Sequence, residues 1–143
     1  MNTNAAILTV GLAAAVYIVL KKETSLFSSY DPTDPTNINS VWNATENNKP
    51  SYTYSMHASD ANDLSETIYN ALSAFSTDFN TVFSAIKKCS TQGDVYQIAQ
   101  LFMDNYDVSL WTSLINGFGL YPGSGISNSQ AKQINDYVNS LPL

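Results

Sequence analysis

The stretch STDFNTVFSAIKKCSTQGDVYQIAQLF, residues 76–102, has the pattern of two short helices joined by a turn. Thr77-Asp78 can cap the first helix, and two lysines at residues 87–88 suit the negative end of its dipole. Thr91 can cap the second helix. Apolar residues recur on one face of each segment, which predicts two helices that share a core. The residues expected to point inward are Val82, Phe83, Ile86, Val95, Ile98, Leu101 and Phe102.

Helical spacing continues on both sides of this stretch. A preceding helix can be capped by Ser59 or Asp60, a fourth is expected at residues 108–116, and a last one begins at Ser127. Their apolar faces are Leu64, Ile68 and Leu72, then Leu110, Trp111, Leu114 and Ile115, then Ala131, Ile134, Tyr137 and Val138. The sequence therefore predicts an all-α domain over residues 57–143, a small bundle of four to five short helices.

A different signal lies near the start of the chain. Residues 5–20, AAILTVGLAAAVYIVL, contain no charged side chain and are followed directly by two lysines. A helix of this length spans about 24 Å, and the uncharged residues before it extend the span to about 30 Å, the thickness of a hydrocarbon core. We therefore expect a single-pass transmembrane anchor over residues 1–22. Its expected residues are Ala5, Ile7, Leu8, Val10, Leu12, Val16, Ile18, Leu20, Lys21 and Lys22.

Two other interpretations of the apolar segment remain open. A cleaved signal peptide has an apolar run of similar length, but no basic side chain precedes this one. A buried core helix would normally show a polar stripe, which this segment lacks. If the segment is an anchor, the lysine pair after it predicts that the C-terminal domain lies on the cytoplasmic side of the membrane.

Residues 23–56 are polar and connect the two parts of the chain. Asp31-Pro32 and Asp34-Pro35 disfavour helix, because each proline removes a backbone donor and restricts the residue before it. We therefore expect an extended polar linker. Trp42, Tyr52 and Tyr54 are its candidate contacts with a partner.

The composition argues against several classes of function. Six lysines, no arginine and twelve acidic side chains give a net charge of -6, which disfavours binding to nucleic acid. A single cysteine cannot form an internal disulfide, and a single histidine cannot build the usual zinc site. We expect neither a metal nor a cofactor.

Candidate catalytic groups are few. His57 could pair with Ser55 or Ser59, and Asp104 with Asp107 raises the question of two carboxylates for glycoside cleavage. A polar residue before a helix and a turn between helices explain these positions more simply, since no oxyanion loop accompanies them. Similar reasoning assigns helix-end roles to Asp60, Asp63, Glu66 and Cys89. We therefore expect that the protein is not an enzyme.

Several of these helix starts and core positions resemble an annexin repeat. They are Ser76-Thr77-Asp78, the Thr91-Gln92 turn, and Tyr106-Asp107 followed by Leu110 and Leu114. The resemblance covers about residues 64–118 and implies a four- or five-helix unit. Annexin calcium sites use a Gly-x-Gly loop and a later acidic side chain. Here residues 73–77 read SAFST and residues 111–118 contain no acid, so calcium binding is not expected.

Single annexin-like modules with a short C-terminal helix also resemble small virion proteins of tailless bacteriophages that infect Bacteroidetes and carry an internal membrane. This resemblance implies a structural protein that links the virion membrane to the capsid or its vertex, as a single copy or a homo-oligomer, and that enters the host inner membrane before assembly. The alternatives are a membrane-tethered cell-wall-degrading enzyme using carboxylates near Asp60 or Asp104, and a host inner-membrane adaptor or holin-like protein.

Overall fold

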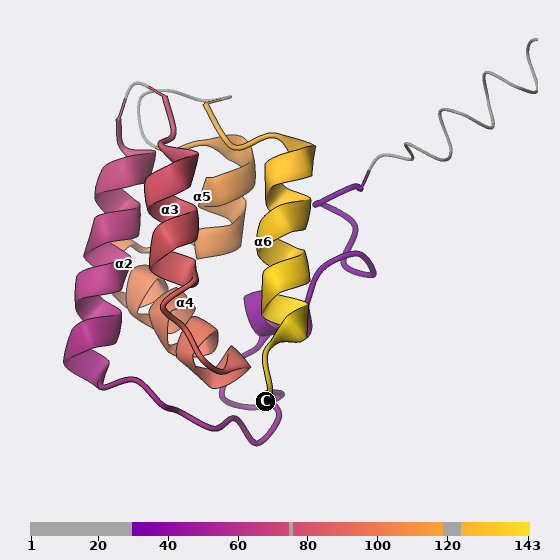
Figure 1. Cartoon of the computed structure of the whole chain (residues 1–143), viewed down its shortest axis with the longest axis vertical. Helices are drawn as coiled ribbons and strands as arrows, with labels where there is room; N and C mark the ends of the chain where they lie inside the picture. Colours follow the sequence, from indigo (N-terminus) through magenta and orange to yellow (C-terminus); the bar gives the residue numbers. More distant parts are fainter. Residues whose placement is uncertain (1–29, 75, 119–123) are drawn as a thin grey trace, which may run out of the picture. The chain divides into compact units, whose positions relative to one another are not determined.

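The computed structural model describes residues 30–74, 76–118 and 124–143. Residues Asp31–Leu143 form one compact unit. Its elements, shown in Figure 1, are the 3₁₀ helix η1 (Ser40–Asn43) and the α-helices α2 (Ala58–Leu72), α3 (Phe79–Ile86), α4 (Gln92–Tyr106), α5 (Leu110–Asn116) and α6 (Asn128–Ser140). No strand occurs in the described ranges, so the prediction of an all-α domain is confirmed.

The predicted anchor, residues 1–22, lies outside the described residues, as do residues 23–29 of the predicted linker. Within the ranges that the structure describes, none of the helices has the length and apolar character needed to cross a bilayer.

Side-chain caps fix most of the helix starts at the predicted residues. Asp78 accepts a hydrogen bond from the backbone of Thr81 at the start of α3, and Thr91 and Ser127 form capping boxes at α4 and α6. The predicted caps of α2 are wrong. Its N-cap is His57, which makes no side-chain cap, because the helix already begins at Ala58 and includes Ser59 and Asp60 in its first turn.

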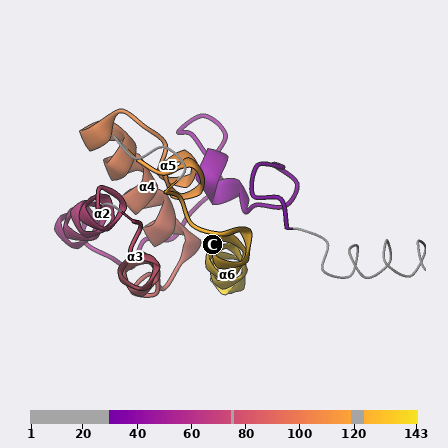
Figure 2. The same cartoon turned by 90° about the horizontal axis from the view of Figure 1, so that it is seen from above.

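The helices enclose one core. Figure 2 shows α2, α3 and α6 nearly end-on, with α4 running obliquely across them. Most of the predicted inward residues are buried, but Phe83, Leu101, Ile115 and Tyr137 are only half-buried at the edges of their helical faces. The largest fully buried apolar side chains are Phe102, Ile68, Leu72, Ile86, Ile98, Leu110, Leu114 and Ile134.

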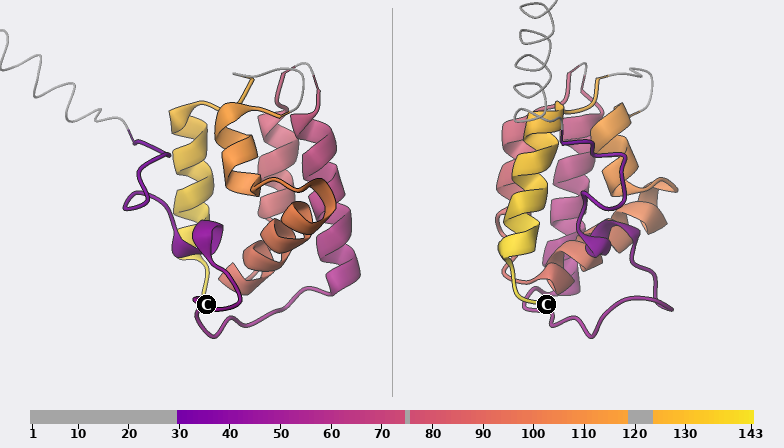
Figure 3. Two further views of the ribbon diagram at one scale, coloured as in Figure 1. Left: turned by 180° about the vertical axis from the view of Figure 1, so that it is seen from behind. Right: turned by 90° about the vertical axis from the view of Figure 1, so that its right-hand side faces the viewer.

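Residues 31–56, which we call the strap, do not form the extended linker that the sequence predicts. The strap lies along the domain beside α6 and α4 (Figure 3). Val41 is 1% exposed and Trp42 is 7% exposed, and the Trp42 ring stacks on Trp111 with centroids 4.8 Å apart. Trp111 also donates from Nε1 to the carbonyl of Pro32 at 2.9 Å. The strap is therefore part of the folded domain.

The two Asp-Pro pairs explain why this polar segment is compact. Asp31 accepts hydrogen bonds from the backbone and hydroxyl of Thr33, and Asp34 makes the same pair of bonds with Thr36. Each Asp-Pro-Thr unit therefore closes a local turn through its aspartate side chain. The two prolines disfavour helix here, as expected from the sequence. They occur in turns, however, and not in the extended chain that the sequence predicted.

Buried Asn135 of α6 holds the next part of the strap. It is 2% exposed, accepts from the backbone of Asn39 at 2.7 Å and donates to the carbonyl of Asn37 at 3.0 Å. Asn39 also donates to Asn139 at 2.8 Å. A buried amide whose donor and acceptor are both used specifies one register of the strap on α6.

If the strap is part of the core, Trp42→Ala should lower the free energy of unfolding by about 3–5 kcal/mol, because it removes a buried aromatic ring and leaves a cavity. Urea denaturation of the full chain in detergent, followed by far-UV circular dichroism, measures this change. The control is Met103→Ala on α4, where the side chain is 40% exposed, which should cost under about 0.5 kcal/mol. Equal effects of the two substitutions would contradict the packing of the strap.

Candidate functional site

The carboxylate of Asp94, in the first turn of α4, is completely buried and joins three segments of the chain. It accepts from the backbone of Ser55 and Met56 at 2.8 and 3.0 Å, and from the Ser55 hydroxyl at 2.5 Å. It also accepts from the backbone of Ser90 at 2.9 Å and of Thr91 at 3.2 Å. Both oxygens are thus used to fix the end of the strap against the start of α4.

The backbone of the strap approaches α4 closely at the same place. A Cβ atom on Gly93 would lie 2.1 Å from the carbonyl oxygen of Thr53, so only glycine fits there without displacing the strap. The same carbonyl accepts a hydrogen bond from the Thr91 hydroxyl at 2.6 Å. Gly93, Asp94 and Thr91 therefore form one attachment point.

The protonation equilibrium of Asp94 reflects these contacts. Burial on its own would raise the pKa of this carboxyl, but the hydrogen bonds from Ser55, Ser90 and Met56 outweigh burial and hold the pKa below its usual value. The group is therefore ionised at neutral pH, and its charge stabilises the folded state.

The pairing of His57 with a serine, which the sequence left open as the less favoured interpretation, is not present in the part of the chain that the structure describes. The Ser55 hydroxyl donates to Asp94 instead, and Ser59 lies within α2. The His57 carbonyl accepts a hydrogen bond from the backbone of Ala61 at 3.0 Å, but its imidazole makes none with a described residue. The imidazole is exposed at the N-cap position of α2, as expected of a polar residue that precedes a helix.

The other candidate groups occupy helix ends or helix surfaces. Asp104 is exposed on α4, while Asp107 is the C-cap of that helix, in the left-handed region at φ 56°. Among the described residues, no three acidic, histidine or cysteine side chains gather as metal ligands. Cys89 is 2% exposed, and burial raises the pKa of its thiol to about 12, with a further contribution from Asp94. The thiol therefore stays protonated at neutral pH.

The three predicted partner contacts have different environments. Trp42 is in the core, which removes it from the surface that a partner could contact. Tyr52 is half-buried and its ring lies 5.2 Å from that of Tyr96. Tyr54 is 45% exposed, so it is the one of the three that remains well exposed to solvent.

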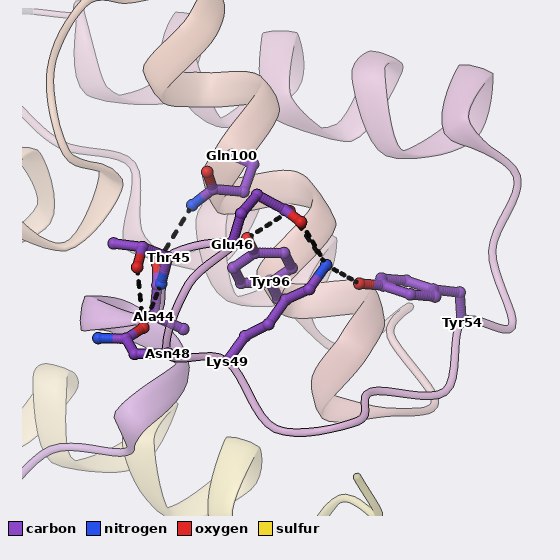
Figure 4. Close-up of polar contacts among 8 residues, drawn as sticks. All are labelled: Ala44, Thr45, Glu46, Asn48, Lys49, Tyr54, Tyr96 and Gln100. Carbon is purple, nitrogen blue, oxygen red and sulfur yellow. Dashed lines mark hydrogen bonds and ion pairs between the residues drawn. The ribbon is translucent and has the colours of Figure 1, made fainter.

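Tyr54 belongs to a polar cluster between the strap and α4, drawn in Figure 4. Lys49 forms an ion pair with Glu46 at 2.9 Å, donates to the Tyr54 hydroxyl at 3.3 Å and lies 5.1 Å from the centre of the Tyr96 ring. The Tyr96 hydroxyl donates to Glu46 at 2.8 Å. Burial, followed by the neighbouring Glu46, raises the pKa of Tyr96 to about 12, so this hydroxyl remains a donor.

Beside this cluster lies an open pocket of about 300 Å³. The strap contributes Glu46 and Tyr54, α2 contributes Ala58, and α4 contributes Tyr96, Gln97, Gln100, Leu101 and Asp104. This pocket was not predicted from the sequence. The available signal was the polar face of α4, where Gln97, Gln100 and Asp104 recur at helical spacing opposite the apolar stripe. The strap side could not be predicted, because its contact with α4 depends on tertiary folding.

Replacing Asp94 by Asn should destabilise the domain by about 2–4 kcal/mol, because the amide nitrogen would face backbone donors that now bond a carboxylate. The matched control is Asp78→Asn at the exposed N-cap of α3, where the two residue types cap almost equally well and the cost should stay below about 0.5 kcal/mol. Urea unfolding of both variants measures the difference. A cost for Asp94→Asn as small as that of the control would contradict the role assigned to Asp94.

The free energy of unfolding of the domain should also depend on pH, because Asp94 titrates with a lowered pKa in the folded state. Because its folded-state pKa lies below the unfolded value, its contribution is complete above the unfolded pKa and is lost as the pH falls through the folded pKa. Urea midpoints measured from pH 7 down to pH 3 should therefore fall, and fall less steeply in Asp94→Asn. Parallel curves for the two proteins would show that another group carries the acid sensitivity.

Comparisons with known proteins identify no relative of this chain. No protein-family model matches it, and searches of curated proteins and of solved structures find no significant match.

Proposed function

We propose that this protein is a membrane-anchored structural protein whose helical domain joins a lipid bilayer to a protein shell. The proposal rests on the apolar run at residues 5–20, which is followed by Lys21 and Lys22. The run is long enough to span a bilayer, and the two lysines that flank it favour the cytoplasmic leaflet. The folded domain of residues 31–143 provides the contact surface on that side.

Because the strap is part of the folded domain, only a short segment of chain connects the proposed anchor to that domain. Roughly eight residues, 23–30, separate Lys22 from the first residue of the folded unit, and an extended chain of that length reaches at most about 28 Å. In the proposed arrangement, the domain therefore works close to the membrane surface. A contact of short reach suits a shell that encloses a membrane at a narrow, fixed spacing.

The charge of the domain favours a protein as its second partner. Removing Lys21, Lys22 and Glu23 from the totals of six lysines and twelve acids leaves four lysines and eleven acids, a net charge of -7. Anionic lipid headgroups repel such a domain, since the cytoplasmic leaflet attracts basic segments instead. The domain is thus suited to contact a basic protein surface while the anchor holds it at the bilayer.

The resemblance to annexin-like modules of virion proteins supports a specific setting, the space between the internal membrane and the capsid or vertex of a tailless bacteriophage. A vesicle derived from the cytoplasmic membrane presents its cytoplasmic leaflet to the capsid, which agrees with the orientation predicted by the lysine pair. This part of the proposal rests on analogy between modules.

Anchoring is tested by expressing the full chain in bacteria and washing the membranes with alkaline carbonate. The protein should remain in the membrane pellet, and Leu12→Arg with Val16→Arg should release it, since each arginine costs about 2.5–3.5 kcal/mol at the centre of a bilayer. The control adds the same charge at two exposed positions of the domain, Asn70→Arg with Gln133→Arg, and should stay in the pellet. Release of the unmodified chain by carbonate would contradict the anchor.

The structural role is tested on purified particles from infected cells, fractionated with detergent and analysed by protein identification. The protein should be found in the particles and should remain with the shell when lipid is extracted at low ionic strength. Recovery only from cell membranes would favour the adaptor or holin-like alternative. Cell-wall degradation that is lost when Asp60, Asp63, Asp104 and Asp107 are replaced by Asn would favour the enzyme.

A further inference from the structure

The pocket beside Tyr54 and Tyr96 offers hydrogen-bond acceptors that the domain itself does not use. The Asp104 carboxylate is exposed and has no ion-pair or hydrogen-bond partner among the described residues. The Oε1 atom of Gln97 is buried and has no hydrogen-bond partner there. The Gln100 side-chain amide donates from Nε2 to the carbonyl of Ala44 at 3.5 Å. This bond orients the side chain, and its amide oxygen accepts no hydrogen bond from a described residue.

A cation already lies next to the pocket, although Lys49 does not itself line it. Lys49 lies over the Tyr96 ring at 5.1 Å and over the Tyr54 ring at 5.9 Å, while Glu46 balances its charge (Figure 4). Because the Lys49 and Glu46 charges offset each other, Asp104 supplies the net charge of the pocket. The exposed Tyr54 ring adds a face that attracts cations.

These features restrict the chemistry of a ligand. An anion would be repelled by Asp104, and an apolar group would cover Asp104 and Gln97 without satisfying either, which is costly. A metal ion would need a cluster of ligands, and the described residues contain no such group. A group with several donors, no acceptor and a positive charge fits best, and a pocket of about 300 Å³ suits the head of one side chain.

We propose that this pocket binds the guanidinium group of an arginine side chain on a partner protein. Guanidinium has five donors in one plane, so it can bond the Asp104 carboxylate and still offer donors to an amide oxygen of α4, and its plane can stack on the exposed Tyr54 ring. Lysine offers a more strongly hydrated point charge that does not stack. A second copy of this chain cannot supply the group, because the sequence contains no arginine. The inference deepens the proposed function, since the partner is the basic surface to which the domain docks.

The test uses the full chain, labelled with ¹⁵N in detergent micelles, and titrates it with N-acetyl-arginine amide. Saturable shifts should appear in the side-chain amides of Gln97 and Gln100 and in the backbone amide of Tyr96. N-acetyl-citrulline amide, which has almost the same shape without the charge, should bind at least threefold more weakly. Equal affinity for arginine and citrulline would overturn the proposal, because the pocket would then not recognise a cation.

A pair of variants locates the charge. Asp104→Asn should weaken arginine binding about two- to fivefold, the range of a partly exposed charge pair. Asp107→Asn removes an exposed acid outside the pocket, in a left-handed conformation that asparagine also tolerates, and should leave the affinity unchanged. Neither substitution removes a side-chain contact with another described residue, so both variants should keep the spectrum of the folded protein. An unchanged affinity in Asp104→Asn, or an equal loss in both variants, would contradict the site.

The outcome is independent of the anchoring experiment. Arginine binding with loss of membrane retention would remove the proposed function and keep the pocket, whereas retention without arginine binding would do the reverse.

Discussion

The fold depends on one buried charge. Asp94 uses both carboxylate oxygens to hold the end of the strap, the turn before α4 and the first turn of α4 itself. A completely buried carboxylate is unfavourable unless its charge is compensated, and here backbone donors and a serine hydroxyl do so. The strap and α4 therefore form together or not at all, because neither can leave this group without its partners.

That constraint organises the rest of the domain around α4. Its first turn attaches the strap, its middle packs Phe102 and Ile98 into the core, and its polar face forms one wall of the pocket. The strap supplies the opposite wall through Glu46 and Tyr54, so the pocket exists only while the attachment at Asp94 holds. The stability of the domain and the integrity of the pocket are consequently linked, because both depend on where the strap lies.

The helices could be predicted from the sequence because their signals are local. Caps at Asp78, Thr91 and Ser127 and apolar spacing depend only on neighbours within a few turns. The strap could not be predicted, since its polar composition resembles a linker, and its anchoring partners Trp111 and Asn135 are distant in sequence. The pocket was missed for the same reason. One of its walls is the strap, and the sequence pattern of α4 describes only the other wall.

The order of contacts along the strap has a mechanical consequence. A pull on the chain before Asp31 would load the Pro32 contact with Trp111 first, then Asn39 with Asn135, then Trp42, and last the Asp94 attachment. Contacts in series yield one at a time, so the strap would detach in steps, and the last step would leave the Asp94 carboxylate at the start of α4 without its bonds from Ser55 and Met56. Complete detachment of residues 31–56 would free a segment whose fully extended length is at most about 90 Å. In the proposed membrane-anchored arrangement, the strap would be a reserve of chain length, released when the membrane and the partner surface move apart.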